Sequence, residues 1–376
     1  MEIPFNKPFL TGLETEYITQ AVESFKICGD GNFTKKCHSF FENKYGFKKA
    51  LLTTSCTDAL EMAAILINIK EGDEVIMPSY TFVSTANAFV LRGAKIVFVD
   101  SQENHPNMDA DLLEGLITEK TKAIVPVHYS GMACDMDKIM SIAKKYNLYV
   151  IEDAAQAIDS YYKGKPLGSF GDMSTFSFHE TKNIISGEGG MLVVNNPEFI
   201  QRAEIIREKG TNRSQFYRGE VDKYGWMDIG SSFLPSDIIA AFLYAQLENL
   251  ERIQTKRREI WDYYYDNLSP LESKGKFSLP ILPKESTNNA HLFYMTLPSI
   301  EDRDEYLKYM RKHKVNPVFH YLSLHKSPFY ENKSVIKEVP NSDKFANQLV
   351  RLPLFYSLTN EEMEYIVKLT YQYFEG

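Results

Sequence analysis

Short apolar segments alternate with helix-like segments along the first two-thirds of the chain. The apolar segments are four or five residues long and begin at Ala50, Glu74, Lys95, Ala123 and Leu148. Helical patterns begin between them, near Cys56, Val83, Asp109 and Asp135. Strands that are apolar along their whole length and separated by helices are typical of a parallel sheet buried on both faces. The pattern therefore predicts an α/β fold with a mostly parallel sheet.

A different pattern begins at Ser236. Apolar residues at helix-compatible spacing continue from there to about Leu268, which predicts a long, uninterrupted helix. Strands are then predicted over 291–297 and 315–320, and helices over 301–313 and 361–371. We expect the long helix to leave one domain and enter another. The predicted domains are a large α/β domain over residues 1–245 and a smaller α+β domain over residues 246–376.

Composition agrees with a two-domain chain, because 376 residues with 44% apolar content can bury a large core. No apolar run reaches membrane-spanning length, and the first ten residues lack the basic and apolar regions of a signal peptide. The net charge of −8 is spread without a long basic run, which disfavours nucleic acid. The cysteines, at positions 28, 37, 56 and 134, show no paired spacing for zinc or disulfides. These features predict a cytoplasmic protein without a membrane or nucleic-acid partner.

Two residues with complementary chemistry follow predicted strands. Asp153 ends the apolar segment that begins at Leu148, and Lys182 follows a strand-like segment at 175–178. Ligands of parallel sheets bind at the carboxyl ends of the strands, so neighbouring strands would bring this acid and this amine to one sheet edge. Either residue alone also suits an ordinary strand end or a surface position. Together they indicate a pyridoxal phosphate site.

Pyridoxal phosphate requires these residue types. A carboxylate against the pyridine nitrogen keeps that nitrogen protonated, because a nearby opposite charge favours the charged form. A lysine forms a Schiff base with the cofactor aldehyde and then carries protons, and its pKa shifts readily on burial. Gly187, Gly189 and Gly190 allow tight turning just after Lys182, where the cofactor must approach closely.

Further candidates for cofactor contacts lie on strand-end loops. Ser55, Cys56 and Thr57 open a predicted helix, where backbone N–H groups suit a phosphate, although they equally suit an ordinary N-cap. Phe82 could stack on a flat ring, with a core position as the alternative. Gln156 could bond the ring hydroxyl, and Ser177 could add a phosphate contact.

Several motifs together carry a family resemblance. In the central part of the chain they are SCTDALE, PSYTFVSTANA, IEDAAQA, SFHETKN and GEGG. In the flanking parts they are IPFNKP, CGDGNFTK, REKGTNRSQF, FHYLSLH and RLPLFY. This set resembles the DegT/StrS-type sugar-nucleotide aminotransferases over nearly the whole chain. The resemblance implies a fold-type-I pyridoxal phosphate enzyme, related in architecture to aspartate aminotransferase.

The resemblance also implies roles for individual residues. Lys182 matches the lysine that attaches the cofactor, and Asp153 matches the partner of the ring nitrogen. Gln156 matches the polar residue near the ring oxygen, and Phe82 the stacking aromatic, while Thr57 and Ser177 match phosphate contacts. Ser232 stands where many members have an asparagine that reaches the cofactor phosphate of the neighbouring subunit.

Family members are homodimers with active sites at the subunit boundary, and the charged segment 207–226 fits this arrangement. Arg213 in that segment is a candidate for the diphosphate of a sugar nucleotide, with a solvated loop of mixed charge as the alternative. His320, Tyr321 and His325 are candidates for sugar hydroxyls and ring faces.

The substrates follow from the same resemblance. It implies transfer of an amino group from L-glutamate to C4 of dTDP-4-dehydro-6-deoxy-D-glucose. The products would be 2-oxoglutarate and dTDP-4-amino-4,6-dideoxy-D-galactose, a sugar nucleotide for lipopolysaccharide or surface-antigen synthesis. Amination at C3, or of a sugar carried by UDP or GDP, stays open.

Other classes of function also stay open at this point. Some relatives are dehydratases with a histidine in place of the lysine, which Lys182 argues against, although His179 lies close by. A non-catalytic sugar-nucleotide-binding regulator would be expected to lose Asp153 or Lys182, and both are present.

A metal site built from His128, His320 and His325 is the remaining alternative. Pro317 and Pro328 predict a loop rather than a helix around the last two histidines, and no carboxylate neighbours them in the sequence. We therefore expect no metal.

Overall fold

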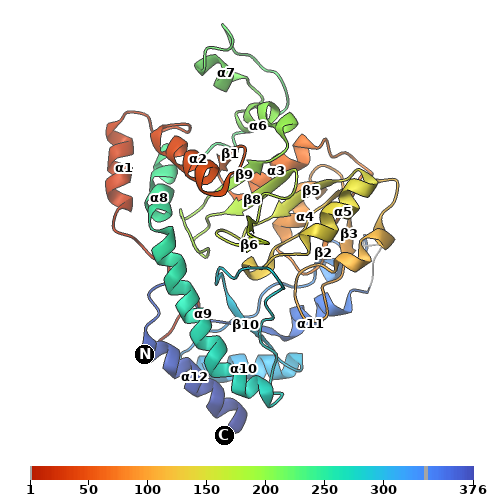
Figure 1. The fold of residues 1–376 in the computed structure, drawn as a ribbon, viewed down its shortest axis with the longest axis vertical. Helices are drawn as coiled ribbons and strands as arrows, with labels where there is room; N and C mark the ends of the chain where they lie inside the picture. The colour runs from red at the N-terminus through yellow and green to blue at the C-terminus, as the bar shows by residue number, and fades with distance from the viewer. Residues whose placement is uncertain (1, 334–337) are drawn as a thin grey trace.

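The computed structural model describes residues 2–333 and 338–376, and a seven-stranded sheet forms the centre of its larger part (Figure 1). Its strands, in spatial order, are β1 (Ala50–Thr53), β9 (Gly190–Val194), β8 (Met173–Ser177), β5 (Tyr149–Asp153), β4 (Thr121–Ile124), β2 (Glu74–Pro78) and β3 (Lys95–Val99). From β8 to β3 all neighbours are parallel, whereas β9 is antiparallel to both β1 and β8. The predicted mostly parallel sheet is confirmed.

Helices cover both faces of this sheet. Alternate residues of a strand point to opposite faces, so Leu51 belongs to one core and Leu52 to the other. The core on the Leu52 side includes side chains of α2 (Asn32–Tyr45), α5 (Met136–Tyr146) and α8 (Asp237–Glu248). The opposite core includes side chains of α3 (Cys56–Leu66), α4 (Val83–Val90) and α6 (Ile200–Arg207). This double cover explains why the strands are continuous apolar segments in the sequence.

The C-terminal part of the chain has its own core. This part of the chain contains the antiparallel pair β10 (Phe293–Thr296) and β11 (Leu349–Leu352). Its helices are α9 (Leu250–Ser273), α10 (Ile300–Lys312), α11 (Pro340–Gln348) and α12 (Asn360–Glu375). Ile3 is fully buried in this core, so the N-terminal segment packs with the C-terminal part. Both chain ends accordingly lie at the same end of the molecule (Figure 1).

The remaining elements are short or peripheral. They are α1 (Glu14–Glu23), α7 (Arg213–Tyr217), the pair β6 (Tyr161–Tyr162) and β7 (Lys165–Pro166), and the 3-10 turns Tyr129–Gly131, Pro197–Phe199 and Leu324–Lys326. Within residues 2–333 and 338–376, no helix combines the length and the apolar composition that crossing a bilayer requires.

The predicted long helix is two helices in the structure. α8 ends at Glu248 and α9 begins at Leu250, because Asn249 departs from helical geometry with φ −105° and ψ 11°. The predicted domain boundary at 245/246 consequently lies inside α8, whose apolar side chains pack in the core of the large sheet. The division of the chain into two domains stays a prediction.

Two other predicted elements are wrong. The helix expected near Asp109 is a pair of 3-10 turns, Ala110–Leu112 and Glu114–Leu116, and the second contains Gly115, which disfavours helix. The strand expected over 315–320 forms only isolated bridges, from Val315 to Ile3 and from Val318 to Arg351. Pro317 lies between them and has no N–H to extend a ladder.

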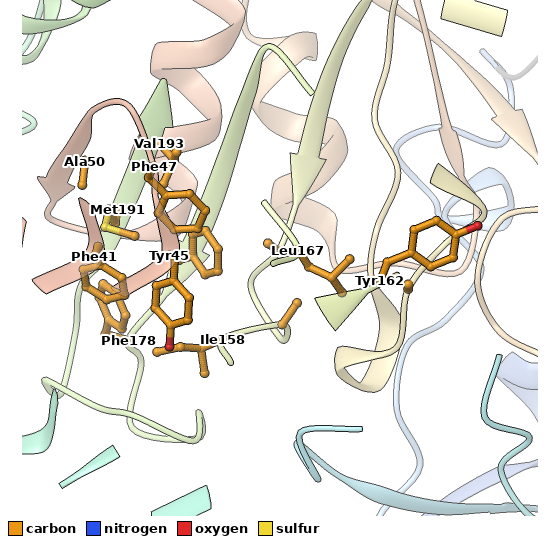
Figure 2. Close-up of a cluster of buried hydrophobic side chains, with 14 of the residues drawn as sticks. Phe41, Tyr45, Phe47, Ala50, Ile158, Tyr162, Leu167, Phe178, Met191 and Val193 are labelled. Carbon is orange, nitrogen blue, oxygen red and sulfur yellow. The ribbon is translucent and has the colours of Figure 1, made fainter. Parts of the chain in front are cut away.

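Aromatic packing anchors the segment that leads to Lys182. Phe178 directly follows β8 and lies beside Phe41 of α2, with 5.7 Å between the ring centroids. Tyr45 of the same helix and Met191 of β9 belong to the same buried cluster (Figure 2). The loop after β8 therefore starts from a rigid position.

Candidate active site

A cavity of about 860 Å³ lies at the carboxyl ends of β5 and β8. Its wall combines loops of the large sheet with segment 318–321 and Arg351 of the C-terminal part. Phe5 and Asn6 of the N-terminal segment also line it. This is the edge where parallel sheets bind ligands.

Asp153 lies at the end of β5, beside Thr175 of the parallel strand β8. Its carboxylate accepts hydrogen bonds from Thr85 Oγ1 at 2.7 Å and from the backbone N–H of Ala155 at 3.2 Å. Burial raises the pKa of the Asp153 carboxyl, against the effect of these hydrogen bonds and of the Lys182 charge. A cationic ring nitrogen at this position would stabilise the carboxylate, so the site suits a protonated pyridine.

Lys182 lies in the loop after β8 and lines the same cavity. Burial lowers the pKa of Lys182; negative charge on Cys56 or Asp153 acts in the opposite direction, and the Arg351 charge adds to the lowering. Asn183 holds the loop in place, because its Nδ2 donates at 2.8 Å to both Gln254 Oε1 and the Asn289 carbonyl. The structure thus brings together the predicted acid and the predicted amine.

The N-terminus of α3 forms another part of the wall. The Ser55 hydroxyl accepts a hydrogen bond from the Asp58 N–H at 3.0 Å, so this side chain acts as the N-cap. Thr57 donates to the Ser84 hydroxyl at 2.8 Å, and both side chains line the cavity together with Cys56. A helix N-terminus flanked by hydroxyls suits a phosphate.

Phe82, Gln156 and Ser177 also line the cavity, as the sequence predicted. Phe82 is 55% exposed, which excludes the core position that was the alternative. Gln156 is buried and held on both sides, because its Oε1 accepts from the Ser130 N–H at 2.7 Å and its Nε2 donates to the Tyr321 hydroxyl at 2.8 Å.

His320 and Tyr321 of the C-terminal part also line the cavity. Their rings stack at 3.6 Å between centroids, and His320 Nδ1 shares a hydrogen bond of 2.8 Å with the Tyr129 hydroxyl. Burial lowers the pKa of His320 far below its ordinary value, and the charges of Arg351 and Lys182 lower it further. This imidazole is therefore neutral at neutral pH.

Three predicted site residues lie outside this cavity. His325 is buried elsewhere, with Nδ1 at 2.9 Å from the Ser79 hydroxyl. Arg213 lies on α7, on a segment that extends away from the sheet (Figure 1), and it pairs with Glu208 at 3.0 Å. Ser232 is exposed, and its backbone forms an isolated antiparallel β-bridge with that of Glu208.

Three further residues line the cavity although the sequence did not identify them as site residues: Arg351, His291 and Phe5. A charged residue inside an otherwise apolar strand is the signal that could have found Arg351. His291 and Phe5 gave no such signal, because each lies in a segment whose pattern is ordinary.

The histidines of the metal alternative belong to separate networks. His128 shares a hydrogen bond of 3.0 Å with Glu152, whereas His320 and His325 bond Tyr129 and Ser79. Among the residues that the structure describes, no group of three or more histidines, cysteines or carboxylates is arranged to hold a metal ion.

Comparison with known proteins shows the family to which the chain belongs. Residues 9–370 match the sequence profile of the DegT/DnrJ/EryC1/StrS aminotransferase family. The chain belongs to this family. It is 36% identical to the GDP-perosamine synthase of Escherichia coli O157:H7, over 97% of this chain and 96% of that protein. It is 31% identical to the GDP-perosamine synthase of Caulobacter vibrioides, over 96% and 95%.

A solved structure supports the same conclusion. Spr1654 from Streptococcus pneumoniae, in its PLP form, aligns with a TM-score of 0.89 and 27% identity over 98% of this chain and 97% of that chain. The chain is a fold-type-I, pyridoxal phosphate-dependent aminotransferase of a family that acts on nucleotide sugars. The predicted fold, enzyme class and cofactor are confirmed.

The residues of the aminotransferase cavity fit pyridoxal phosphate. Asp153 suits the ring nitrogen, Lys182 the aldehyde, and the N-terminus of α3 the phosphate. Gly190 allows β9 to pack closely against the N-terminus of α3, because a Cβ at that position would lie 2.2 Å from the Ser55 carbonyl carbon.

Proposed function

We propose that this aminotransferase moves an amino group from L-glutamate to C4 of a nucleotide-linked 4-keto-6-deoxy sugar. The observation that carries the proposal is the placement of both residues in one cavity, with Asp153 at the end of β5 and Lys182 in the loop after the adjacent parallel strand β8. An acid and an amine in this relation suit the opposite ends of the cofactor ring.

Lys182 and Asp153 have different tasks in this proposal. Bound pyridoxal phosphate supplies an electron sink for the carbon that loses its proton. Asp153 holds the ring nitrogen protonated through its negative charge. Lys182 Nζ removes the proton from the α-carbon of glutamate and, in the second half of the reaction, delivers a proton to C4 of the sugar. The lowered pKa of Lys182 favours the neutral amine that this transfer needs.

The other cavity residues position the reactants. We propose that the cofactor phosphate is held by Ser55, Cys56, Thr57 and Ser177. Phe82 is proposed to stack on the cofactor ring. Gln156 is proposed to bond the ring hydroxyl, for which its two hydrogen bonds already set the orientation of the amide. His320 and Tyr321 are proposed to contact the sugar.

The enzyme is proposed to act as a homodimer in the cytoplasm. Arg213 and Ser232 lie outside the cavity of their own chain. We assign Arg213 to the sugar diphosphate and Ser232 to the cofactor phosphate of the partner's site.

The cysteines agree with a reducing compartment, because no disulfide joins Cys28, Cys37, Cys56 or Cys134. His325 has no proposed contact with the sugar, because it does not line the cavity.

Two sugar nucleotides are candidates for the acceptor. The sequence motifs favour dTDP-4-dehydro-6-deoxy-D-glucose, which would yield dTDP-4-amino-4,6-dideoxy-D-galactose and 2-oxoglutarate for surface polysaccharide synthesis. A GDP-linked keto sugar is the second candidate, because two relatives over nearly the whole chain are GDP-perosamine synthases.

The test offers each acceptor to the pyridoxamine phosphate form of the enzyme. Purified enzyme is first converted with glutamate and freed of 2-oxoglutarate, then mixed with 4-keto or 3-keto dTDP sugars or with a GDP-linked 4-keto sugar. NMR of the product identifies the aminated carbon. A 4-amino dTDP sugar supports the first candidate, and a GDP product supports the second. A 3-amino product would contradict the proposed regiochemistry.

A further inference from the structure

His291 has its ring proton fixed on one nitrogen by a hydrogen bond in the cavity wall. Its ring lines the cavity, and Nδ1 lies 2.8 Å from Asn183 Oδ1. The orientation of the Asn183 amide is set on its other side, because Nδ2 donates at 2.8 Å to the Asn289 carbonyl, which can only accept. Asn183 Oδ1 therefore faces the imidazole and also can only accept. It follows that Nδ1 of His291 carries the proton and donates it.

The other ring nitrogen of His291 is a bare acceptor. Burial lowers the pKa of His291 far below its ordinary value, and the charges of Lys182, Arg257 and Arg351 lower it further, so the ring carries one proton only. Nε2 makes no hydrogen bond to the residues that the structure describes, yet it is not among their buried atoms without a partner. Nε2 is therefore open to the cavity that the ring lines.

The backbone that carries this imidazole is rigid. Arg257 of α9 donates from Nη2 to the His291 carbonyl at 2.6 Å. The neighbouring Asn289 is fully buried, and its Nδ2 donates to the Gln156 carbonyl at 2.8 Å. His291 is thus tied to α9, to the loop after β5 and, through Asn183, to the loop after β8. The ring cannot turn Nε2 away from the cavity without breaking the bond to Asn183.

Lys182 is the donor that matches this acceptor. It lines the same cavity and directly precedes Asn183 in the chain. Its charge is the largest effect on the pKa of His291 after burial, so the two side chains lie within electrostatic range of each other. An ammonium has three donors and no acceptor, and in a buried site these donors need partners. A lysine that carries a proton between two carbons also has to be held in one direction.

We propose that His291 Nε2 accepts a hydrogen bond from the Lys182 amine while Lys182 carries a proton, and that Asn183 fixes the tautomer that this contact needs. The inference rests on the proposed role of Lys182 as the proton carrier. His291 is then a positioning residue, which acts through Lys182 in both half-reactions. A hydroxyl of the sugar is the competing donor, and it would involve His291 in the sugar half-reaction alone.

Two substitutions separate the acceptor from mere support of the fold. His291→Asn can still donate to Asn183 but leaves no acceptor at the position of Nε2. His291→Gln can place an amide oxygen at that position but loses the contact with Asn183. The proposal expects the glutamine variant to stay closer to wild type, whereas a purely structural role favours the asparagine variant. His313→Asn is the matched control, because His313 Nδ1 also donates to a carbonyl, that of Tyr309 at 2.9 Å, outside the cavity.

The first measurement is the pKa of Lys182 in the protein without cofactor. Labelling with acetic anhydride across pH, followed by mass spectrometry of peptides, reports the fraction of neutral amine. A hydrogen bond to the ammonium favours the charged form, so His291→Asn should lower the midpoint by about one pH unit and His291→Gln by less. His313→Asn should leave it unchanged. An unchanged midpoint in His291→Asn, or a larger fall in His291→Gln, would overturn the proposal.

The second measurement compares the half-reactions. Exchange of the α-hydrogen of glutamate in D₂O follows the first, and stopped-flow absorbance of the pyridoxamine form with keto sugar follows the second. His291→Asn should slow both by about 10- to 100-fold, and His291→Gln by less. A loss confined to the keto sugar would assign His291 to a sugar hydroxyl and overturn the proposal. Wild type that exchanges no glutamate hydrogen would contradict the proposed donor, but the labelling of Lys182 would still decide the role of His291.

Discussion

At the scale of single residues, burial pushes Lys182 and Asp153 toward their neutral forms. Burial lowers the pKa of the amine and raises the pKa of the carboxyl. A neutral amine is the form that attacks an aldehyde, whereas the carboxylate becomes favourable again beside a cationic ring. The same burial therefore prepares one residue for reaction and makes the other depend on the cofactor.

Lys182→Ala should abolish covalent attachment of the cofactor and all turnover while the protein stays folded. The expected reason is that, among the residues that the structure describes, no other lysine lines the cavity. Borohydride reduction followed by mass spectrometry of peptides measures the attachment site. Lys144→Ala, which removes an exposed lysine, should keep the adduct. A reduced adduct that persists in the Lys182 variant would assign attachment to another lysine.

Asp153→Asn should bind the cofactor but lose activity. An amide cannot hold the ring nitrogen protonated, and breaking a buried charge pair costs about 3–5 kcal/mol, which corresponds to roughly 10²- to 10⁴-fold in kcat. Steady-state kinetics with glutamate and the keto sugar measures the loss. Activity within about threefold of wild type would remove Asp153 from the mechanism.

The same substitution should stabilise the protein without cofactor. The pKa of Asp153 is raised in the folded state, so folding is coupled to proton uptake by this carboxyl. The contribution of Asp153 to the free energy of unfolding therefore falls as the pH rises above 3.8, the ordinary pKa of an aspartate. Asparagine does not ionise, so apo Asp153→Asn should have the higher Tm at neutral pH, and the difference should shrink toward acidic pH. Thermal unfolding of both apoproteins across pH tests this, with Asp222→Asn as the exposed control. A pH-independent difference would refute the linkage.

At the scale of elements, β9 and the N-terminus of α3 are in unusually close contact. Gly190 begins β9, and a Cβ there would lie 2.2 Å from the Ser55 carbonyl carbon and 2.3 Å from the Cys56 nitrogen. Both atoms belong to backbone, so the helix itself would have to shift. The position of the proposed phosphate site thus depends on this glycine.

Gly190→Ala should weaken the cofactor site and the fold together. Overpacking of this kind costs about 1–3 kcal/mol, which denaturant unfolding measures, and displacement of α3 should lower the affinity for pyridoxal phosphate in a fluorescence titration. Gly115→Ala serves as the control, because no atom lies within 4 Å of a Cβ built there. Wild-type cofactor affinity in Gly190→Ala would show that the phosphate site does not depend on this approach.

At the scale of the whole molecule, several exposed residues suit an interface rather than water. Phe25 is 96% exposed and Trp226 is 84% exposed, with Met227 beside it. Arg213 and Ser232 lie in the same region of the sequence as Trp226 and outside the cavity of their own chain. A second copy would cover the apolar side chains and bring the polar ones to an active site.

Shared sites predict recovery of activity in mixed dimers. Lys182→Ala and Arg213→Gln are each expected to be inactive or strongly impaired. A heterodimer of the two has one site with both changes and one site with neither, so up to half of the wild-type activity per dimer should return. Differently tagged chains, purified as heterodimers, provide the measurement. Heterodimers without recovered activity would place Arg213 outside the partner's site.

The sequence by itself determined the sheet and the acid–amine pair. Both depend on local pattern: strands buried on two faces must be apolar throughout, and each strand positions the residue at its own carboxyl end, as Asp153 shows. The prediction took neighbouring strands as its condition, and the parallel pairing of β5 and β8 in the structure meets that condition.

Only the tertiary structure decided the other wall of the cavity. Phe5, His320 and Arg351 meet there because single backbone bridges join Ile3 to Val315 and Val318 to Arg351, and no periodicity encodes contacts between such distant segments. The same cause placed His325 beside Ser79 instead of in the cavity, although it lies only five residues from His320. Local pattern sets which way a strand faces, but the partners of irregular segments depend on the packing of the whole chain.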